Sequence, residues 1–126
     1  MKYLIDTNII LEILFKQKKK ELCKKFLVDH RGNLNLSTFS LYSIGIHYFK
    51  KRKAVEFKKL IQKFSKEFEF HTLTPMQLQL AVEGNQKFNL DFDDAFQYGV
   101  AKENNFTIVT LDNDFKKVKG TNIIFL

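Results

Sequence analysis

The stretch D-A-F-Q-Y-G-V-A-K-E-N-N-F-T-I-V-T-L-D-N-D spans residues 94–114 and carries the strongest fold signal in the chain. With Asp91 just upstream as a helix-opening residue, its first half predicts a helix over residues 91–104. Its second half contains Thr107-Ile108-Val109-Thr110, a β-branched run that predicts a buried strand. The acidic turn Asp112-Asn113-Asp114 follows that strand directly. A helix that leads into a buried strand with polar residues at its exit is typical of an α/β fold.

The rest of the chain repeats this alternation of short apolar runs and longer helical patterns. We expect strands at residues 3–5, 35–37, 68–73, 107–110 and 123–125. We expect helices at residues 9–14, 18–28, 39–49, 54–68, 74–87 and 91–104, the fifth opened by Thr74 as a cap and Pro75 at its first position. Strands separated by helices favour a parallel sheet covered on both faces. The sequence therefore predicts one α/β domain over residues 1–126, with a central parallel sheet of about five strands.

Length and composition limit the class of protein. A chain of 126 residues fits one domain, and its 44% hydrophobic content is too high for a disordered chain. Cys23 is the only cysteine, so no intramolecular disulfide or cysteine metal cage can form, and a reducing cytoplasm is expected. No apolar run approaches the roughly 20 residues of a membrane span. Asp6 interrupts the start of the chain where a signal peptide would still be apolar.

The charge balance points to an anionic partner. Lys and Arg total 21 against 14 Asp and Glu, a net charge of +7, and only Arg31 and Arg52 are not lysines. Lysine supplies a point charge for a phosphate rather than the bidentate pattern that reads a base. The composition therefore favours binding to a nucleic-acid backbone, with a merely well-solvated surface as the simpler alternative.

Acidic residues gather where the predicted strands end. Asp6 follows the first strand, Asp112 follows the fourth, and Asp94 lies in the helix that precedes the fourth. If the first and fourth strands are neighbours, these three carboxylates converge. Clustered carboxylates repel one another, so they need raised pKa values or a hard divalent cation, Mg²⁺ or Mn²⁺. In a basic protein this pattern indicates metal-assisted hydrolysis of a phosphodiester.

Each acid also has a purely local interpretation. Asp6 and Asp91 could cap helices, and Asp94 could complete a capping box three residues after Asp91. Asp112 and Asp114 could simply belong to a turn. Taken one at a time the local roles are favoured, whereas acids at two strand exits together favour a shared cleft.

Three segments resemble the PIN domain family. Leu4-Ile5-Asp6-Thr7-Asn8 resembles the opening of these domains, and Asp94-Ala95 resembles the start of their later conserved helix, which here ends near Ala101. The segment Ile108-Val109-Thr110-Leu111-Asp112-Asn113-Asp114-Phe115 resembles their last signature. The three segments occur in order and extend over nearly the whole chain.

This resemblance implies a PIN-like three-layer sandwich and a metal-dependent endoribonuclease. Many small members are similar to VapC toxins, which implies RNA as substrate, a cognate antitoxin protein as partner and a homodimer. By position, Asp6, Asp94 and Asp112 would bind the metal and carry the catalysis. Asn8 and Asp114 would support them, and Asp93 would be a neighbour.

The sequence departs from the family at one position. A glutamate is expected in the helix after the second strand, six residues beyond the strand-ending Ser37, and Ser43 stands there. A serine can hold water but adds no charge, so metal affinity should be weaker than in a four-acid site. Glu12, Asp91 or Asp93 could supply the missing charge, and His47 could share the face of Ser43.

Two alternatives to an active nuclease remain at the sequence level. Ser43 is compatible with a catalytically silent PIN-like module that binds RNA or a protein. A phosphatase or nucleotide-binding enzyme is disfavoured, because Asn8 stands where a second aspartate would be needed and no G-x-G-x-x-G or P-loop occurs.

Overall fold

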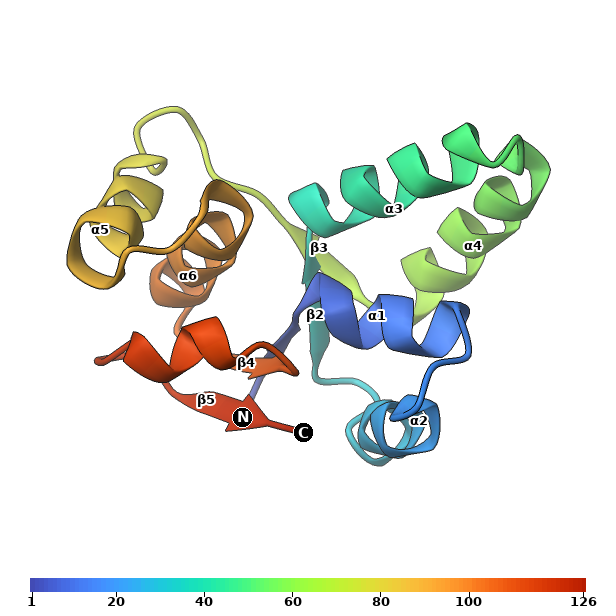
Figure 1. Ribbon diagram of the computed structural model, residues 1–126, viewed down its shortest axis with the longest axis horizontal. Helices are drawn as coiled ribbons and strands as arrows, with labels where there is room; N and C mark the ends of the chain where they lie inside the picture. Colours follow the sequence, from blue (N-terminus) through green and yellow to red (C-terminus); the bar gives the residue numbers. More distant parts are fainter.

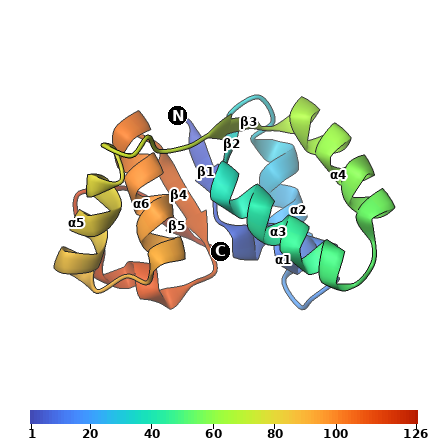
Figure 2. The same ribbon diagram turned by 90° about the horizontal axis from the view of Figure 1, so that it is seen from above.

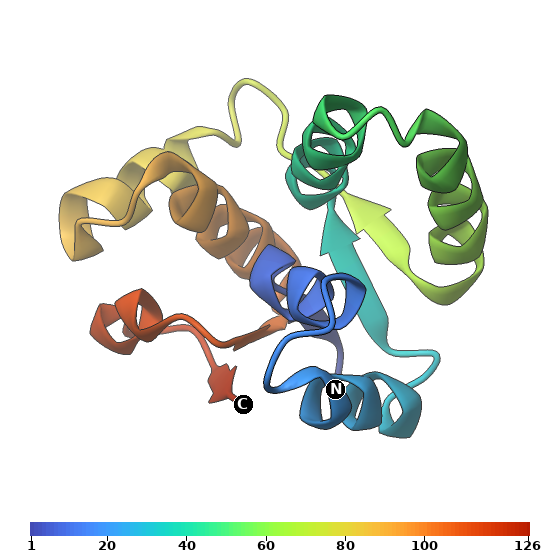
Figure 3. The same cartoon turned by 45° about the vertical axis from the view of Figure 1, so that its right-hand side comes forward.

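The computed structural model describes residues 1–126 and contains a five-stranded, wholly parallel sheet (Figure 1). Its strand order is β3-β2-β1-β4-β5. The strands are β1 (Tyr3–Ile5), β2 (Leu34–Ser37), β3 (Glu69–His71), β4 (Thr107–Thr110) and β5 (Ile123–Phe125). The predicted α/β architecture is confirmed, and Figure 3 shows β2 and β3 lying side by side with their arrows pointing the same way.

Burial explains why these short runs become strands. Every residue of β1, β2 and β4 is buried, whereas the edge strands β3 and β5 are half-buried or exposed. Continuous apolar or β-branched runs suit central strands of a parallel sheet because both faces are covered by helices. In the centre of the sheet Leu4 pairs with Ile108, and Ile5 pairs with Val109.

Six helices cover the two faces of the sheet. They are α1 (Thr7–Leu14), α2 (Lys20–Asp29), α3 (Thr38–Lys50), α4 (Ala54–Glu67), α5 (Gln79–Phe88) and α6 (Phe92–Asn104), with a short 3-10 helix η1 (Asn113–Lys117) between β4 and β5. Figure 2 shows α5 and α6 on one side of the sheet and α1 to α4 on the other. No helix combines the length and the apolar character that crossing a membrane requires.

The two faces of the sheet form two separate cores, as the alternation of strand side chains requires. Leu4 and Ile108 point into a core with α5, α6 and Phe115 of η1. Ile5 and Val109 point into the other core, which also contains the buried thiol-bearing Cys23 of α2. The result is the predicted three-layer arrangement of helices, sheet and helices.

The helix predicted over residues 74–87 begins later than expected, at Gln79. Thr74 and Gln77 form the reciprocal bonds of a capping box, with the Gln77 amide donating to Thr74 Oγ1 at 3.2 Å and the Thr74 amide donating to Gln77 Oε1 at 2.9 Å. The capping signal is thus genuine, but the bonds of Gln79 and Leu80 to Met76 and Gln77 follow the tighter three-residue pattern. The segment is therefore a turn before the helix proper.

The strand order creates a switch point between β1 and β4. From β1 the chain proceeds to β2 and β3 in one direction, and β4 then pairs with the other side of β1. Connections leave the sheet on opposite faces at such a point, so a crevice opens beyond the carboxyl ends of the two strands. Asp6 and Asp112 lie at this edge.

Candidate metal centre

A cavity of about 280 Å³ lies at the switch point. Its walls are formed by the first two turns of α1 and α6, by one face of α3 from Phe39 to His47, and by Asp112 after β4. Its lining residues are Asp6, Thr7, Asn8, Leu11, Phe39, Ser43, His47, Asp93, Asp94, Gln97 and Asp112. Most of these side chains are polar or acidic, so the cavity is suited to a charged ligand.

The tertiary structure brings the sequence-predicted site residues to this one place. Asp6, Asn8, Ser43, Asp93, Asp94 and Asp112 all line the cavity. Asp114 does not line it, but a carboxylate oxygen of Asp114 lies within 4.8 Å of carboxylate oxygens of Asp94 and Asp112. Residues more than a hundred positions apart in sequence therefore share one small volume.

Asp6 is held by the central strands and not by its own helix. It occupies the N-cap position of α1, but its side chain makes no capping bond. Instead Thr110 Oγ1, at the end of β4, donates to Asp6 Oδ2 at 2.7 Å, and the Asp6 amide donates to the Val109 carbonyl at 2.9 Å. Burial raises the pKa of Asp6 to about 6, against the opposing effect of the hydrogen bonds that its carboxylate accepts from Thr110 and from the Thr7 amide.

Asp94 carries the strongest electrostatic perturbation in the cavity. It lies in the first turn of α6 and is 8% exposed. Burial first, then repulsion from Asp6, Asp93, Asp112 and Asp114, raises the pKa of Asp94 to about 8. No Lys, Arg or His forms an ion pair with any of these aspartates. Asp94 makes no capping box with Asp91, whose side chain makes no capping bond either.

Asp112 combines a local role with its place in the cavity. Its Oδ1 accepts a hydrogen bond from the Asp114 amide at 2.8 Å and so caps η1, which confirms the turn interpretation for this residue. Its own amide donates to Thr110 Oγ1 at 2.9 Å. Asn8 fixes the same loop from α1, because Asn8 Oδ1 accepts from the Leu111 amide at 3.3 Å. Thr110 thus connects Asp6 and Asp112 through one hydroxyl.

The sequence analysis missed a buried polar network at the base of the cavity. Gln97 of α6 donates from Nε2 to Ser40 Oγ at 2.7 Å and to Thr7 Oγ1 at 3.3 Å, and the two hydroxyls lie 2.6 Å apart. Gln97 is 1% exposed, and its Oε1 has no hydrogen-bond partner in the protein. The sequence did contain a signal for this network. Gln97 places a side-chain amide about one turn after Asp94, in an otherwise apolar part of the helix.

Comparison with protein families identifies the fold. The family model described as PIN domain matches residues 3–121. This chain belongs to the PIN domain family. The three segments that resembled the family in the sequence all lie within the matched residues. Comparison with curated proteins finds no match.

Solved structures of similar fold come from toxin–antitoxin systems. The PIN domain resembles a toxin-antitoxin complex from Klebsiella pneumoniae with a TM-score of 0.80 at 18% identity, over 98% of this chain and 96% of the other. It resembles VapBC-1 from nontypeable Haemophilus influenzae with a TM-score of 0.81 at 12% identity, over 99% and 98%. It resembles VapC20 of Mycobacterium tuberculosis, a sarcin-ricin loop cleaving toxin, with a TM-score of 0.74 at 15% identity, over 91% and 93%. At these identities the likeness establishes the fold.

The donor atoms of this PIN domain fit a hard divalent cation. Asp94, Asp112 and Asp114 present carboxylate oxygens within 4.8 Å of one another, and oxygen is the ligand that Mg²⁺ and Mn²⁺ prefer. The charges in the cavity have no protein counter-ion, so a cation would relieve their repulsion. The orphaned Gln97 Oε1 adds a buried acceptor at the same place. Asp94, Asp112 and Asp114 are the residues whose carboxylate oxygens lie close enough together to hold one ion, and Asp6 lines the same cavity without belonging to this close group.

The structure also shows which acid lies near Ser43. Of the three residues considered as substitutes for the missing glutamate, only Asp93 lines the cavity. Glu12 instead accepts a hydrogen bond from the Lys19 amide at 2.7 Å, near the end of α1. His47 lines the cavity four residues beyond Ser43. Asp93 on α6 is therefore the one of these three acids that shares the cavity with Ser43.

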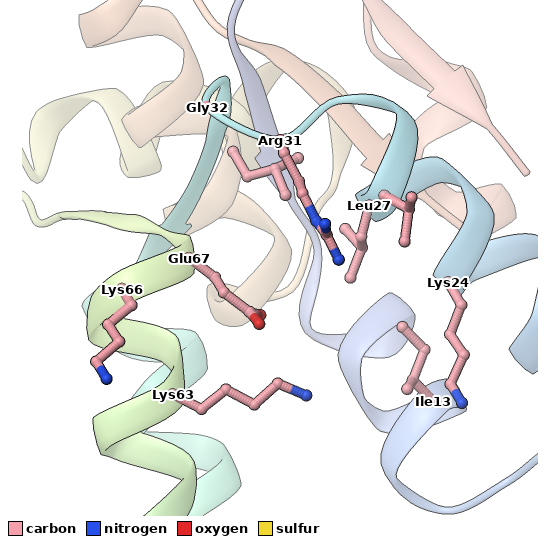
Figure 4. Close-up of a pocket in the computed structure, with 10 residues that line it drawn as sticks. Ile13, Lys24, Leu27, Arg31, Gly32, Lys63, Lys66 and Glu67 are labelled. Atoms are coloured by element: carbon pink, nitrogen blue, oxygen red, sulfur yellow. The ribbon is translucent and has the colours of Figure 1, made fainter.

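A larger hollow of about 380 Å³ lies elsewhere and differs in chemistry. Figure 4 shows it between α4 on one side and α1 and α2 on the other, with Arg31, Lys63 and Glu67 pointing into it. Lys24 and Lys66 also line it, so four cations face a single acid. This hollow has no cluster of carboxylates, which are gathered in the smaller cavity.

We expect Mn²⁺ affinity to rise between about pH 6 and pH 8, because the ion competes with the protons of Asp6 and Asp94. Both carboxyls have raised pKa values in the folded state, so the metal-free protein binds more protons folded than unfolded. Its free energy of unfolding should therefore fall as the pH rises above about 4 and through about 8. Calorimetric titration of Mn²⁺ and thermal unfolding at several pH values measure the two effects.

Asp94→Asn is the decisive variant and Asp91→Asn its matched control. Asparagine cannot ionise, so Asp94→Asn should lose Mn²⁺ binding and flatten the decline in stability above about pH 6. Asp91 lies outside the cavity, three residues away, and its replacement should change neither property. Equal Mn²⁺ binding by native protein and Asp94→Asn would show that the carboxylate cluster is not the metal site.

Proposed function

We propose that this PIN domain is a divalent-metal-dependent endoribonuclease acting in the cytoplasm as the toxin of a type II toxin–antitoxin pair. One observation supports it above the others: Asp6 after β1, Asp94 in α6 and Asp112 after β4 line one cavity, and no Lys or Arg is among its lining residues. PIN family membership and the +7 net charge agree with an RNA substrate.

In this proposal the side chains of the cavity divide into binding and positioning groups. A divalent ion held by Asp6, Asp94 and Asp112 would neutralise phosphate charge and lower the pKa of water for hydrolysis. Thr110 fixes the Asp6 carboxylate, and Asn8 fixes the loop that carries Asp112. Asp94 gives up its proton when the ion binds, because its raised pKa keeps it largely protonated near neutral pH.

The toxin role rests on the structural neighbours. The similar structures from Klebsiella pneumoniae and Haemophilus influenzae are toxin–antitoxin assemblies, and VapC20 is named for cleavage of an RNA loop. By analogy we infer that this chain cleaves RNA and is neutralised by a cognate antitoxin protein. The fold likeness covers nearly the full length of each of these two compared chains.

Asp6→Asn and Asp94→Asn should each reduce Mn²⁺-dependent RNA cleavage by roughly 100-fold or more, because removal of one ligand charge forfeits several kcal/mol of charge stabilisation. The measurement is the initial rate on a mixed panel of single-stranded and hairpin RNAs, with Asp91→Asn as the active control. Expression of the native chain should arrest bacterial growth, and expression of Asp94→Asn should not. Cleavage by both variants at the native rate would refute the proposal.

The silent-module alternative is favoured by Ser43, which brings no charge to the cavity wall. Ser43→Glu separates the two hypotheses. For an active enzyme the change should tighten Mn²⁺ binding and alter an existing cleavage rate, because a further carboxylate faces the ion. If the native chain is inert with every RNA and Ser43→Glu creates metal-dependent cleavage, the native protein is a binding module.

A homodimer is the expected assembly, and α3 offers a surface for it. Tyr42, Ile46 and Phe49 recur at helical spacing and are 65%, 57% and 64% exposed. Large apolar side chains in one stripe are typical of a protein interface. Sedimentation should give a dimer for the native chain and a monomer for Ile46→Glu. A native chain that remains monomeric at micromolar concentration would contradict this expectation.

A further inference from the structure

A second hollow lies beside the acidic cavity and shares His47 with it. This hollow, of about 90 Å³, is lined by Leu14, Phe15, His47, Tyr48, Lys51 and Lys53. His47 lines both, and Leu11 of α1 lines the acidic cavity on the same side. Figure 1 shows α3 lying above α1, with both helices running away from the sheet in the same direction. The two hollows, which together extend from Asp6 to Phe15, are here called the α1–α3 groove.

The two ends of the α1–α3 groove have opposite charge. The inner end holds Asp6, Asp94 and Asp112. At the outer end the turn between α3 and α4 consists of four consecutive cations, Lys50-Lys51-Arg52-Lys53, all exposed. None of the four forms an ion pair, and no acid lines the second hollow. These cations are free to bind the phosphates of a strand whose scissile phosphate lies among the acids.

The outer hollow also offers aromatic surface beside that charge. Lys51 Nζ lies 4.2 Å from the centre of the Phe15 ring, and the rings of Phe15 and His47 meet edge to face with centres 5.9 Å apart. Tyr48 is half-buried beside them, with one face stacked on Phe57. An aromatic ring next to a cation is the combination that proteins use to bind single-stranded nucleic acid, since unpaired bases stack while phosphates are neutralised.

The dimensions suit a short single strand. Asp6 and Phe15 flank the two ends of α1 and are nine residues apart. At a rise of 1.5 Å per residue they are separated by about 13 Å along the helix axis. A strand that extends this far passes from the acids to the basic turn within a few nucleotides. A paired base would not be free to stack on Phe15, so the geometry selects unpaired RNA.

We propose that the α1–α3 groove binds the unpaired RNA segment adjacent to the scissile phosphate. Lys51 and Lys53 contact its phosphates, and one base stacks against Phe15 and His47. This assignment rests on the proposed ribonuclease function, and it adds the path of the substrate and a requirement for unpaired nucleotides on one side of the cleavage point.

The test compares two double variants that remove the same charge from different surfaces. Lys51→Gln/Lys53→Gln alters the α1–α3 groove, whereas Lys63→Gln/Lys66→Gln alters the larger basic hollow of Figure 4. Binding of a fluorescent single-stranded RNA is measured in EDTA over a range of salt. The groove variant should bind about 10-fold more weakly, and its salt slope should be smaller by about 1.4, since each phosphate contact on a single strand contributes about 0.7. The control variant should retain the native slope.

A matched pair of substitutions in protein and RNA tests the stacked base. Phe15→Leu keeps an apolar side chain but removes the ring, and should weaken binding about 5-fold or more. An abasic site is placed in turn at each of the three positions on either side of the cleavage point. At one of these positions, on one side of the cleavage point, the abasic site should weaken RNA binding by the native protein by the same factor of about 5. The abasic site at that position should not change RNA binding by Phe15→Leu. Thermal unfolding is first used to show that every variant has the same unfolding temperature as the native protein.

The outcomes separate this inference from the function on which it rests. If native protein cleaves or binds RNA but the two double variants lose affinity equally, the α1–α3 groove has no special role and the inference is wrong. An abasic site that affects native protein and Phe15→Leu alike also contradicts it. If native protein neither binds nor cleaves any RNA, the proposed function itself fails. Native-like RNA binding by the groove variant, with loss of binding to a protein partner, would assign the groove to that partner instead.

Discussion

Parallel pairing of β1 with β4 places the acids of this protein in one cavity. The Asp6 amide donates a hydrogen bond to the Val109 carbonyl, and the Thr110 hydroxyl donates one to the Asp6 carboxylate. Asp6 is therefore fixed by the carboxyl end of β4, the strand that Asp112 follows. Helix α6 precedes β4 and packs on the opposite face from α1, which brings Asp94 to the same edge. A shift in the register of β4 would move Thr110 away from Asp6 and separate the acids.

The cavity is electrostatically opposite to the protein as a whole. A chain with a net charge of +7 concentrates its unpaired carboxylates in a small buried volume, where Asp94 meets four other aspartates. Such crowding is unfavourable unless protons or a cation neutralise it. The raised pKa values of Asp6 and Asp94 indicate that protons serve this purpose in the metal-free protein, and in the proposed site a divalent ion would displace them.

Helix α3 carries Ser43, the one position at which the sequence departs from the expected family pattern, and it extends from the acidic cavity to a basic turn. In its first half Ser43 contributes a hydroxyl in place of a carboxylate, while Asp93 on α6 supplies an additional charge to the same cavity. At its end the residues Lys50 to Lys53 gather positive charge where the helix dipole is negative, which is a favourable placement. The helix thus connects a weakened acid site to a strongly basic turn through the side chain of His47.

The sequence alone determined the fold class, the order of elements and the identity of the acids near the strand exits. These features are local, because apolar runs set the strands and short motifs mark their ends. It placed the start of α5 wrongly, since a capping box at Thr74 signals the onset of helical geometry and says nothing of how soon a regular helix follows. The sequence also left the local and shared roles of Asp112 as alternatives, and the structure combines them.

Tertiary structure alone decided which distant residues meet. The network of Thr7, Ser40 and Gln97 joins three helices, so no spacing within one segment could reveal it. Asp93 shares the cavity with Ser43, and Glu12 does not, because of where α6 packs. The α1–α3 groove exists because α1 and α3 lie side by side. Contacts of this kind arise from the packing of whole elements across a sheet, whereas a sequence pattern records only the face that each element buries.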